Sequence, residues 1–278
     1  MAINADTLSL FEQHLRGEEK SKNTVQKYLH DANTFLLFSN GREISKELTI
    51  AYKEQLVRLL AVSSVNSMLA ALGTFLDFLG FGDCKVKPLK TQRRIFASED
   101  KQLTQEAYEK MITLAKREGK DRLCAIMQTL GNTGIRISEL SYITAEAVRQ
   151  GKVTVNCKGK IREIFIHNKL QKLLLKYIKT HNIQSGSVFV TKSGKPVDRS
   201  NLWREMQELS CRAEVDKQKA FPHNLRHLFA RTYYKLKKDI VRLSDILGHS
   251  NIQTTRIYIM TSGNEYRREL AGLGLVVT

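Results

Sequence analysis

Apolar residues recur at every third or fourth position through most of this chain of 278 residues. This spacing places them along one face of a helix, so it predicts a mainly helical fold. In the first 80 residues the spacing occurs in four segments, at residues 7–15, 23–38, 48–62 and 64–80. Helices this short bury their apolar faces against one another, so the four segments predict a small N-terminal helix bundle.

The helical pattern stops near Cys84 and resumes at about Leu103. The stretch between these residues is basic and has no apolar period, so we expect a linker over residues 84–101. This linker could lie along a phosphate backbone, or it could be an ordinary solvated loop. The chain therefore divides into an N-terminal domain at 1–83, the linker, and a second domain at 102–278.

The second domain contains a predicted β-hairpin. Residues 152–167 alternate apolar and polar side chains, and the pair Gly159-Lys160 in their middle suits a turn. We expect the chain to turn there and to return through Ile164 and Ile166, which makes an antiparallel pair of strands.

Helices make up most of the rest of this domain. Residues 104–119 and 121–134 have helical spacing, and Ser200 is a plausible N-cap for another helix. Residues 187–191, "SVFVT", predict one further short strand. The fold class is therefore mainly α with a small antiparallel β-sheet.

The chain is strongly basic, with a formal net charge of +17 and a pI of about 9.7. Almost all of that charge, +16, lies in residues 91–278. A charge this large predicts an anionic partner, either nucleic acid or a membrane surface. No apolar run approaches the length of a membrane span, and no basic helix has an aromatic face, so nucleic acid is favoured.

The N-terminus and the cysteines predict the cellular compartment. The stretch "MAINADTLSLFEQHL" is polar and acidic, unlike a signal or transit peptide. The four cysteines lie far apart without a CxxC pair, which argues against a zinc ribbon and against a disulfide framework. We therefore expect a cytoplasmic protein with reduced thiols.

The segment "FPHNLRHLFA" puts His223, Arg226 and His227 on one helical turn. These residues could bind a metal, form the polar face of a helix, or grip an anion. A metalloprotease helix has glutamate directly after its first histidine, where this chain has Asn224, and no third ligand is evident. We therefore expect no metal.

Short motifs elsewhere supply five more polar residues: Arg136 and Glu139 in "TGIRISEL", Lys158 in "CKGK", His249 in "LGHSN" and Tyr258 in "TTRIYIM". The resulting order of Arg, Lys, His-x-x-Arg, His and Tyr resembles the tyrosine recombinases, also called the phage-integrase family. The resemblance covers nearly the whole chain. It implies a four-helix, SAM-like core-binding domain followed by an α+β catalytic domain.

The resemblance also implies a role for each site residue. Arg136 and Arg226 would clamp the non-bridging oxygens of a DNA phosphate, because guanidinium groups donate in a plane and keep their charge. Glu139 would orient this arginine site. His223 and His249 would donate hydrogen bonds to the phosphate or move the proton of the nucleophile, whereas His227 has no assigned role.

Two choices remain within the motifs. Lys158 would be the general acid for the leaving 5′ oxygen, with Lys160 as a rival two residues away. Among Tyr233, Tyr234, Tyr258 and Tyr266, Tyr258 would be the nucleophile because it follows His249 at the family's spacing. Tyr233 and Tyr234 are expected to be packing residues. A methionine, Met260, stands where many relatives have histidine.

The implied reaction is site-specific strand exchange through a 3′-phosphotyrosyl intermediate, without ATP, cofactor or metal. The implied partners are double-stranded DNA with paired recombination sites and other copies of the chain, which would be a monomer in solution and a tetramer on DNA. The apolar tail at 261–278 would pack on its own domain or on a neighbour. Alternatives are a type IB topoisomerase and a non-catalytic DNA-binding relative. The length favours a Xer-like or small mobile-element recombinase.

Overall fold

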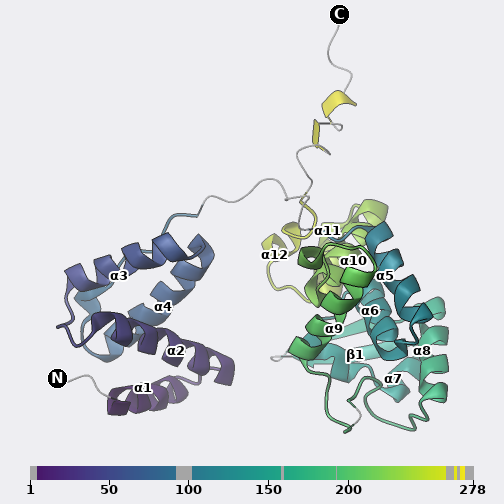
Figure 1. Ribbon diagram of the computed structural model, residues 1–278, viewed down its shortest axis with the longest axis horizontal. Coiled ribbons are helices and arrows are strands. Elements are labelled where there is room, and N and C mark those ends of the chain that lie inside the picture. Colours follow the sequence, from purple (N-terminus) through teal and green to yellow (C-terminus); the bar gives the residue numbers. More distant parts are fainter. Residues whose placement is uncertain are drawn as a thin grey trace, which may run out of the picture. The chain divides into compact units, whose positions relative to one another are not determined.

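Figure 1 shows the computed structural model of the protein. The structure describes residues 5–91, 102–157, 160–191, 193–260, 266–267 and 270–272. The chain separates into two compact units, Met1–Arg93 and Arg94–Thr278. None of the helices in the described ranges is long and apolar enough to cross a membrane.

The described part of the N-terminal unit is built from four α-helices: α1 (Ala5–Gly17), α2 (Lys22–Ser39), α3 (Lys46–Leu59) and α4 (Val62–Phe78). Serine caps start two of them, because the side chains of Ser21 and Ser45 accept hydrogen bonds from backbone N–H groups three residues on. The apolar faces meet in one cluster, in which Phe11, Phe35 and Phe75 are fully buried. The predicted N-terminal bundle is confirmed.

The segment after α4 belongs to this bundle as far as Leu89. It begins with the 3₁₀ helix η1 (Gly82–Cys84). Asn66 of α4 exchanges two hydrogen bonds with the backbone of Leu89, at 3.0 and 2.8 Å, and the hydroxyl of Thr49 donates to the carbonyl of Cys84 at 2.6 Å. The first part of the segment predicted as a linker, 84–101, therefore packs on the N-terminal unit. Its last ten residues lie outside the described residues.

The second unit contains the remaining described elements: α5 (Gln105–Arg117), α6 (Asp121–Thr133), η3 (Ile137–Tyr142), α7 (Ala145–Gln150), β1 (Lys152–Cys157), β2 (Lys160–Phe165), α8 (Asn168–Thr180), α9 (Arg199–Arg212), η4 (Lys217–Lys219), α10 (Pro222–Lys237), α11 (Ile240–Leu247) and α12 (Ile252–Arg256).

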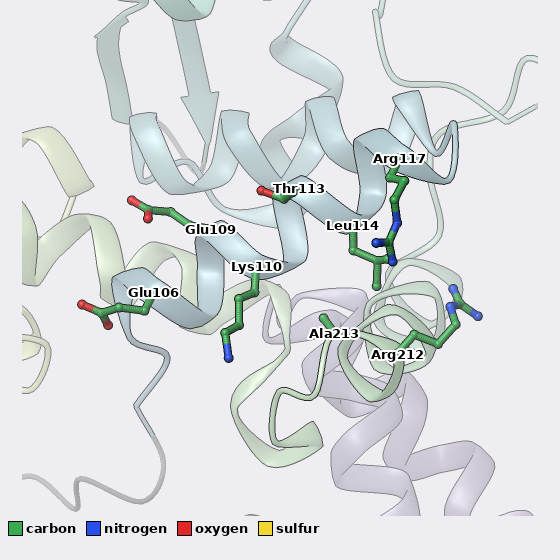
Figure 2. Close-up of a pocket in the computed structure, with 8 residues that line it drawn as sticks. All are labelled: Glu106, Glu109, Lys110, Thr113, Leu114, Arg117, Arg212 and Ala213. Carbon is green, nitrogen blue, oxygen red and sulfur yellow. The ribbon is translucent and has the colours of Figure 1, made fainter.

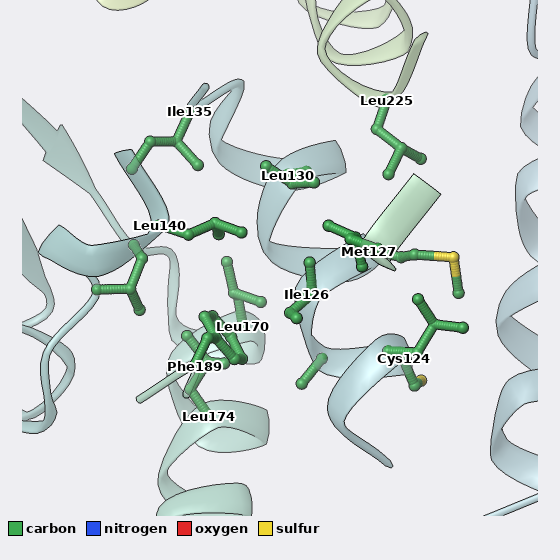
Figure 3. Packing of buried hydrophobic residues seen from close by; sticks show 14 of the residues in the cluster. Cys124, Ile126, Met127, Leu130, Ile135, Leu140, Leu170, Leu174, Phe189 and Leu225 are labelled. Carbon is green, nitrogen blue, oxygen red and sulfur yellow. The ribbon is translucent and has the colours of Figure 1, made fainter. Parts of the chain in front are cut away.

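Helix α6 runs through the core of this unit. It packs against α5, α8, α9 and α10, and its residues Ile126, Met127 and Leu130 are fully buried. Figure 3 shows Leu225 of α10 reaching toward this helix from one side and Leu170 of α8 approaching from another. The packing of α10 against α6 fixes the position of the helix that carries the histidine–arginine motif.

Strands β1 and β2 form the predicted antiparallel hairpin. Val153 pairs with Ile164, and both side chains are buried, as the alternation predicts. The last pair joins Cys157 to Lys160, so Lys160 belongs to the ladder and not to the turn that was predicted at Gly159-Lys160. Among the described residues the sheet has these two strands.

Two expectations about the segment before α9 are wrong. Residues 187–191 make single bridges, Ser187 with Thr144 and Val190 with Pro196, because they pair at isolated positions and form no continuous ladder. Helix α9 is capped by Asp198, which accepts from a backbone N–H at 2.9 Å, so Ser200 lies inside its first turn.

Candidate active site

Helix α10 presents the three polar residues of the motif together. The extended Phe221 and Pro222 at the first helical position start this helix. From that start, His223, Arg226 and His227 lie three and four residues apart and share one face. The opposite face is apolar and packs on α6, so the polar face is turned to the segments that carry the other predicted site residues.

Arg226 is buried, with 1% of its surface exposed. Its NH1 donates to the carbonyl of Gly134, and its NH2 donates to the carbonyl of Leu247 at 2.7 Å and to Nε2 of His249 at 2.9 Å. Burial and the charge of Arg136 lower its pKa to about 10, so it stays cationic at neutral pH. Its Nε–H is buried and has no hydrogen-bond partner among the described residues.

The turn after α6 has to be glycine at one position. Gly134 ends the helix with φ +63°, and a Cβ there would lie 2.5 Å from the ring of Phe229. This close approach brings the carbonyl of Gly134 to Arg226. The next two residues lead directly to Arg136, so the two predicted arginines are held at one place.

Glu139 ties Arg136 to the hairpin. It is 2% exposed, accepts from NH1 of Arg136 at 3.0 Å, and takes two hydrogen bonds from Arg162 of β2 at 3.0 and 2.6 Å. Burial alone would raise the pKa of this carboxyl, but the hydrogen bonds from Arg162 and from the Arg136 backbone, with both positive charges, lower it overall. Glu139 is therefore an anion that holds two arginines.

Arg162 is a residue that the sequence analysis missed. It occupies the same face of the hairpin as the buried Ile164 and Ile166, since residues two apart point the same way. A charge at an inward-facing strand position was the signal that could have revealed it. A Cβ at Gly248 would lie 2.8 Å from the Arg162 guanidinium, so Arg162 also supports the turn before His249.

His249 follows the glycine that ends α11. Its Nδ1 lies 2.8 Å from the hydroxyl of Thr255, and its Nε2 accepts from Arg226. Because Nε2 accepts, the proton of the neutral ring is on Nδ1 and is donated to Thr255. Burial, together with the charges of Arg226 and Arg136, lowers the pKa of His249 to about 4, so this ring is neutral at pH 7.

Tyr258 follows α12 and is buried, with 7% exposed. Its hydroxyl lies 3.2 Å from Nε2 of His223. Its ring stacks on His227 with a centroid distance of 4.1 Å and an interplanar angle of 27°, and Arg226 lies 6.0 Å from its centroid. Three side chains of α10 therefore surround the predicted nucleophile.

The two histidines of α10 are both held neutral. Desolvation lowers the pKa of His223, and Arg226, Arg199 and Arg136 lower it further by repulsion. Burial, with His223 and two nearby arginines, lowers the pKa of His227 to about 3. A neutral His223 can accept the proton of the Tyr258 hydroxyl.

The remaining residues singled out from the sequence include Lys158, Tyr233 and Tyr234. Lys158 falls outside the described residues, although the strands on both sides of it are described. Tyr233 and Tyr234 pack against the small cluster that contains Tyr258, as expected for packing residues. Within the described ranges, no three side chains of His, Cys, Asp or Glu come together as a metal site would require.

A separate groove of about 490 Å³ lies between α5 and α9. Figure 2 shows Glu106 and Glu109 near one end of it and Arg117 and Arg212 near the other. Arg212 pairs with Glu118 at 3.0 Å. None of the predicted site residues lines this groove, so the groove is separate from the candidate active site around Tyr258.

Comparison with known proteins agrees with this arrangement. Residues 101–265, more than half of the chain, match the model of the phage integrase family. In an alignment of 284 positions, the chain is 28% identical to tyrosine recombinase XerA of Pyrococcus horikoshii. This alignment covers 99% of this chain and 96% of the relative.

Solved structures share the fold. A lambda integrase (75–356) dimer bound to a COC′ core site has a TM-score of 0.75 at 16% identity and covers 95% of this chain and 98% of its own. A lambda integrase tetramer bound to a Holliday junction has a TM-score of 0.74 at 16% identity, with 92% and 77% covered. The predicted fold class is confirmed. The chain therefore belongs to the phage integrase family, the tyrosine recombinases, which cleave and rejoin DNA.

Proposed function

We propose that this protein is a site-specific DNA recombinase in which Tyr258 is the nucleophile of its own chain's active site. The observation that carries the proposal is the hydrogen bond between the Tyr258 hydroxyl and His223, next to a buried arginine that is cationic at neutral pH. A nucleophile, a base and a cation at one point are the parts that phosphoryl transfer needs.

In the proposed first step, the Tyr258 oxygen bonds to a DNA phosphorus while the bond from phosphorus to the 5′ oxygen breaks. His223 takes the phenolic proton, because its Nε2 is neutral and hydrogen-bonded to that hydroxyl. The charge of the approaching phosphate counteracts the repulsion from the arginines and so makes His223 a better base. The product is a 3′-phosphotyrosyl bond.

Arg226 and Arg136 stabilise the charge that develops on the non-bridging oxygens. Support comes from the unpaired Nε–H of Arg226 and from the half-buried Arg136, which Glu139 holds in place. His249 contributes by fixing Arg226, and the phosphate competes with Nε2 of His249 for the NH2 group. Fixed donors of this kind need no reorganisation during the reaction.

Lys158 protonates the leaving 5′ oxygen. In the sequence it directly follows β1, and support comes from Arg162, which ties the other strand of the same hairpin to Glu139. The 5′ hydroxyl of a partner strand then attacks the phosphotyrosyl bond and releases Tyr258. Each step exchanges one phosphoester bond for another, so the reaction requires no ATP.

Strand exchange needs two DNA sites and several active sites. We propose that the protein is a monomer in solution and assembles as a homotetramer on paired double-stranded sites in the cytoplasm, with its tail, residues 261–278, docked on a neighbour. Support comes from the net charge of +17 and from the fold shared with an integrase solved as a tetramer on a Holliday junction.

The variant Tyr258→Phe tests the proposal. It removes the nucleophilic oxygen and leaves the ring, so DNA binding should persist while covalent attachment is lost. A denaturing gel of protein mixed with nicked site DNA measures attachment, and a native gel measures binding. A covalent band that persists in this variant would transfer the role to another tyrosine, with the exposed Tyr266 as the next candidate.

A further inference from the structure

His227 is a half-buried histidine of the motif, and neither the sequence analysis nor the proposed mechanism assigns it a role. Its ring lies against Tyr258 with a centroid distance of 4.1 Å, nearly parallel at 27°. It also meets His223 edge to face, at 4.9 Å and 88°. One ring thus contacts both the proposed nucleophile and its proposed base.

We propose that His227 is a positioning residue that seats the aromatic ring of Tyr258 so that its hydroxyl points at His223 and at the phosphate. The stacked face fixes the plane of the Tyr258 ring, and the hydrogen bond to His223 fixes the direction of the hydroxyl within that plane. Together the two contacts leave the nucleophilic oxygen a single position.

Such a seat adds to the support that Tyr258 receives from its own segment, where its backbone N–H donates to the carbonyl of Thr255 at 3.0 Å. Helix α12 before it, Ile252–Arg256, is five residues long, and the adjacent Ile257 is exposed. Helix α10, in contrast, is sixteen residues long and is packed on α6. The seat therefore joins the Tyr258 side chain, which follows a short helix, to a long helix that is packed on the core.

The chemical state of the His227 ring suits stacking against Tyr258 and does not suit proton transfer. Its ring stays neutral because burial lowers its pKa to about 3, and the described contacts of this ring are contacts with other rings. A neutral flat ring can stack on tyrosine throughout the working pH range. An aromatic side chain without nitrogen should therefore replace it.

The test compares His227→Ala with His227→Phe in single-turnover formation of the covalent adduct at saturating DNA. We expect the alanine variant to form adduct about 10–100-fold more slowly, because a nucleophile misplaced by about 1 Å loses rate on that order. The phenylalanine variant should stay within about threefold of the wild type. Both variants should bind DNA normally, and the pH dependence of the remaining rate should be unchanged.

Tyr234→Ala is the matched control, since it removes a half-buried aromatic side chain of the same helix that packs on the apolar cluster containing Tyr258. Its melting temperature should fall about as far as that of His227→Ala, without a comparable loss of adduct rate. Equal losses of rate in the two alanine variants would reduce His227 to a packing residue. A shifted pH profile, or no recovery with phenylalanine, would show that the imidazole itself takes part.

The inference rests on Tyr258 being the nucleophile, and the two proposals fail separately. Tyr258→Phe run beside these variants tests the nucleophile. If that variant loses the adduct while His227→Ala keeps the wild-type rate, the seat is refuted and the proposed function stands. If Tyr258→Phe keeps the adduct, the assignment of Tyr258 as the nucleophile is overturned, and the seat with it.

Discussion

The hydroxyl of Tyr258 lies 3.2 Å from Nε2 of His223, although 35 residues separate the two in the chain. Neither residue is close to the other in any local element, since His223 opens α10 and Tyr258 follows α12. The contact exists because α10 and α11 pack together and α12 folds against α11. The proposed nucleophile and its base are therefore joined by tertiary packing.

Replacing Arg136 or Arg226 by alanine should slow cleavage to a similar extent, but only the Arg226 variant should also lose thermal stability. Each alanine variant should lose cleavage by roughly 10²–10³-fold, as expected for the loss of one charged donor to the phosphate. Arg226→Ala should also lower the melting temperature, because it leaves the carbonyls of Gly134 and Leu247 without their donor. Single-turnover cleavage and thermal unfolding measure the two effects.

The control for both arginine variants is Arg212→Ala. Arg212 is exposed and pairs with Glu118 away from the site, so its loss should leave the cleavage rate unchanged. A wild-type cleavage rate in Arg136→Ala or in Arg226→Ala would remove that arginine from the phosphate site.

A change of leaving group in the DNA substrate should show whether Lys158 is the general acid. A substrate whose 5′ bridging oxygen is replaced by sulfur needs no proton to leave, because a thiolate is a far weaker base than an alkoxide. Lys158→Ala should therefore be slow on normal DNA and should recover on the sulfur substrate. Lys160→Ala is the control and should be close to wild type on both. If the sulfur substrate restores cleavage by Lys160→Ala and not by Lys158→Ala, the general acid is Lys160.

The bridge from Arg162 to Glu139 should matter for both stability and cleavage. Arg162→Ala removes two hydrogen bonds from a carboxylate that is 2% exposed, which should cost about 3 kcal/mol of unfolding free energy. Arg162→Lys should not restore this unfolding free energy, because an ammonium group cannot donate two parallel hydrogen bonds to one carboxylate as a guanidinium does. Denaturant unfolding and single-turnover cleavage give the two values.

A double variant, Arg162→Met with Glu139→Gln, separates the two roles of this bridge. Removing both charges should recover part of the unfolding free energy, because no lone charge stays buried. Cleavage should remain slow, since Arg136 would still lack its anchoring carboxylate. Recovery of cleavage together with stability would mean that the bridge acts on the fold alone.

Stability should fall as the solution is acidified from pH 7 to pH 5. His227 and His249 bind protons near pH 6.5 in the unfolded chain, but only near 3 and 4 when folded. Between these values the unfolded state holds more protons, so lowering the pH favours unfolding. The two residues together should remove about 2–4 kcal/mol of unfolding free energy between pH 7 and pH 5.

Urea unfolding at several pH values tests this dependence. His227→Phe should make the unfolding free energy less dependent on pH, whereas His30→Gln, which changes an exposed histidine of the N-terminal unit, should not. An unfolding free energy that is the same at pH 7 and pH 5 in the wild type would contradict the depressed pKa values.

The sequence by itself determined the local elements and the order of the motifs. A spacing of three to four residues found the helices, and alternation found the hairpin and its inward face, because both patterns report which side of one element is buried. Boundaries were less secure. Asp198 and Ser200 are both good cap residues two positions apart, and only the folded backbone selects the first.

Tertiary structure decided how the motif residues act on one another. The motif implied that Arg226 clamps a phosphate, but it did not reveal that Arg226 is buried and bonded to Gly134 and Leu247, 92 and 21 residues away. Arg162 reaches Glu139 from the hairpin, and His227 became a neighbour of Tyr258 only when α12 folded back. The spacing of apolar residues shows which face of one element is buried, but it contains no information about contacts between elements. Such contacts depend on how α6, α10, α11 and the hairpin pack, and that packing set the partners, burial and charge of each side chain in the site.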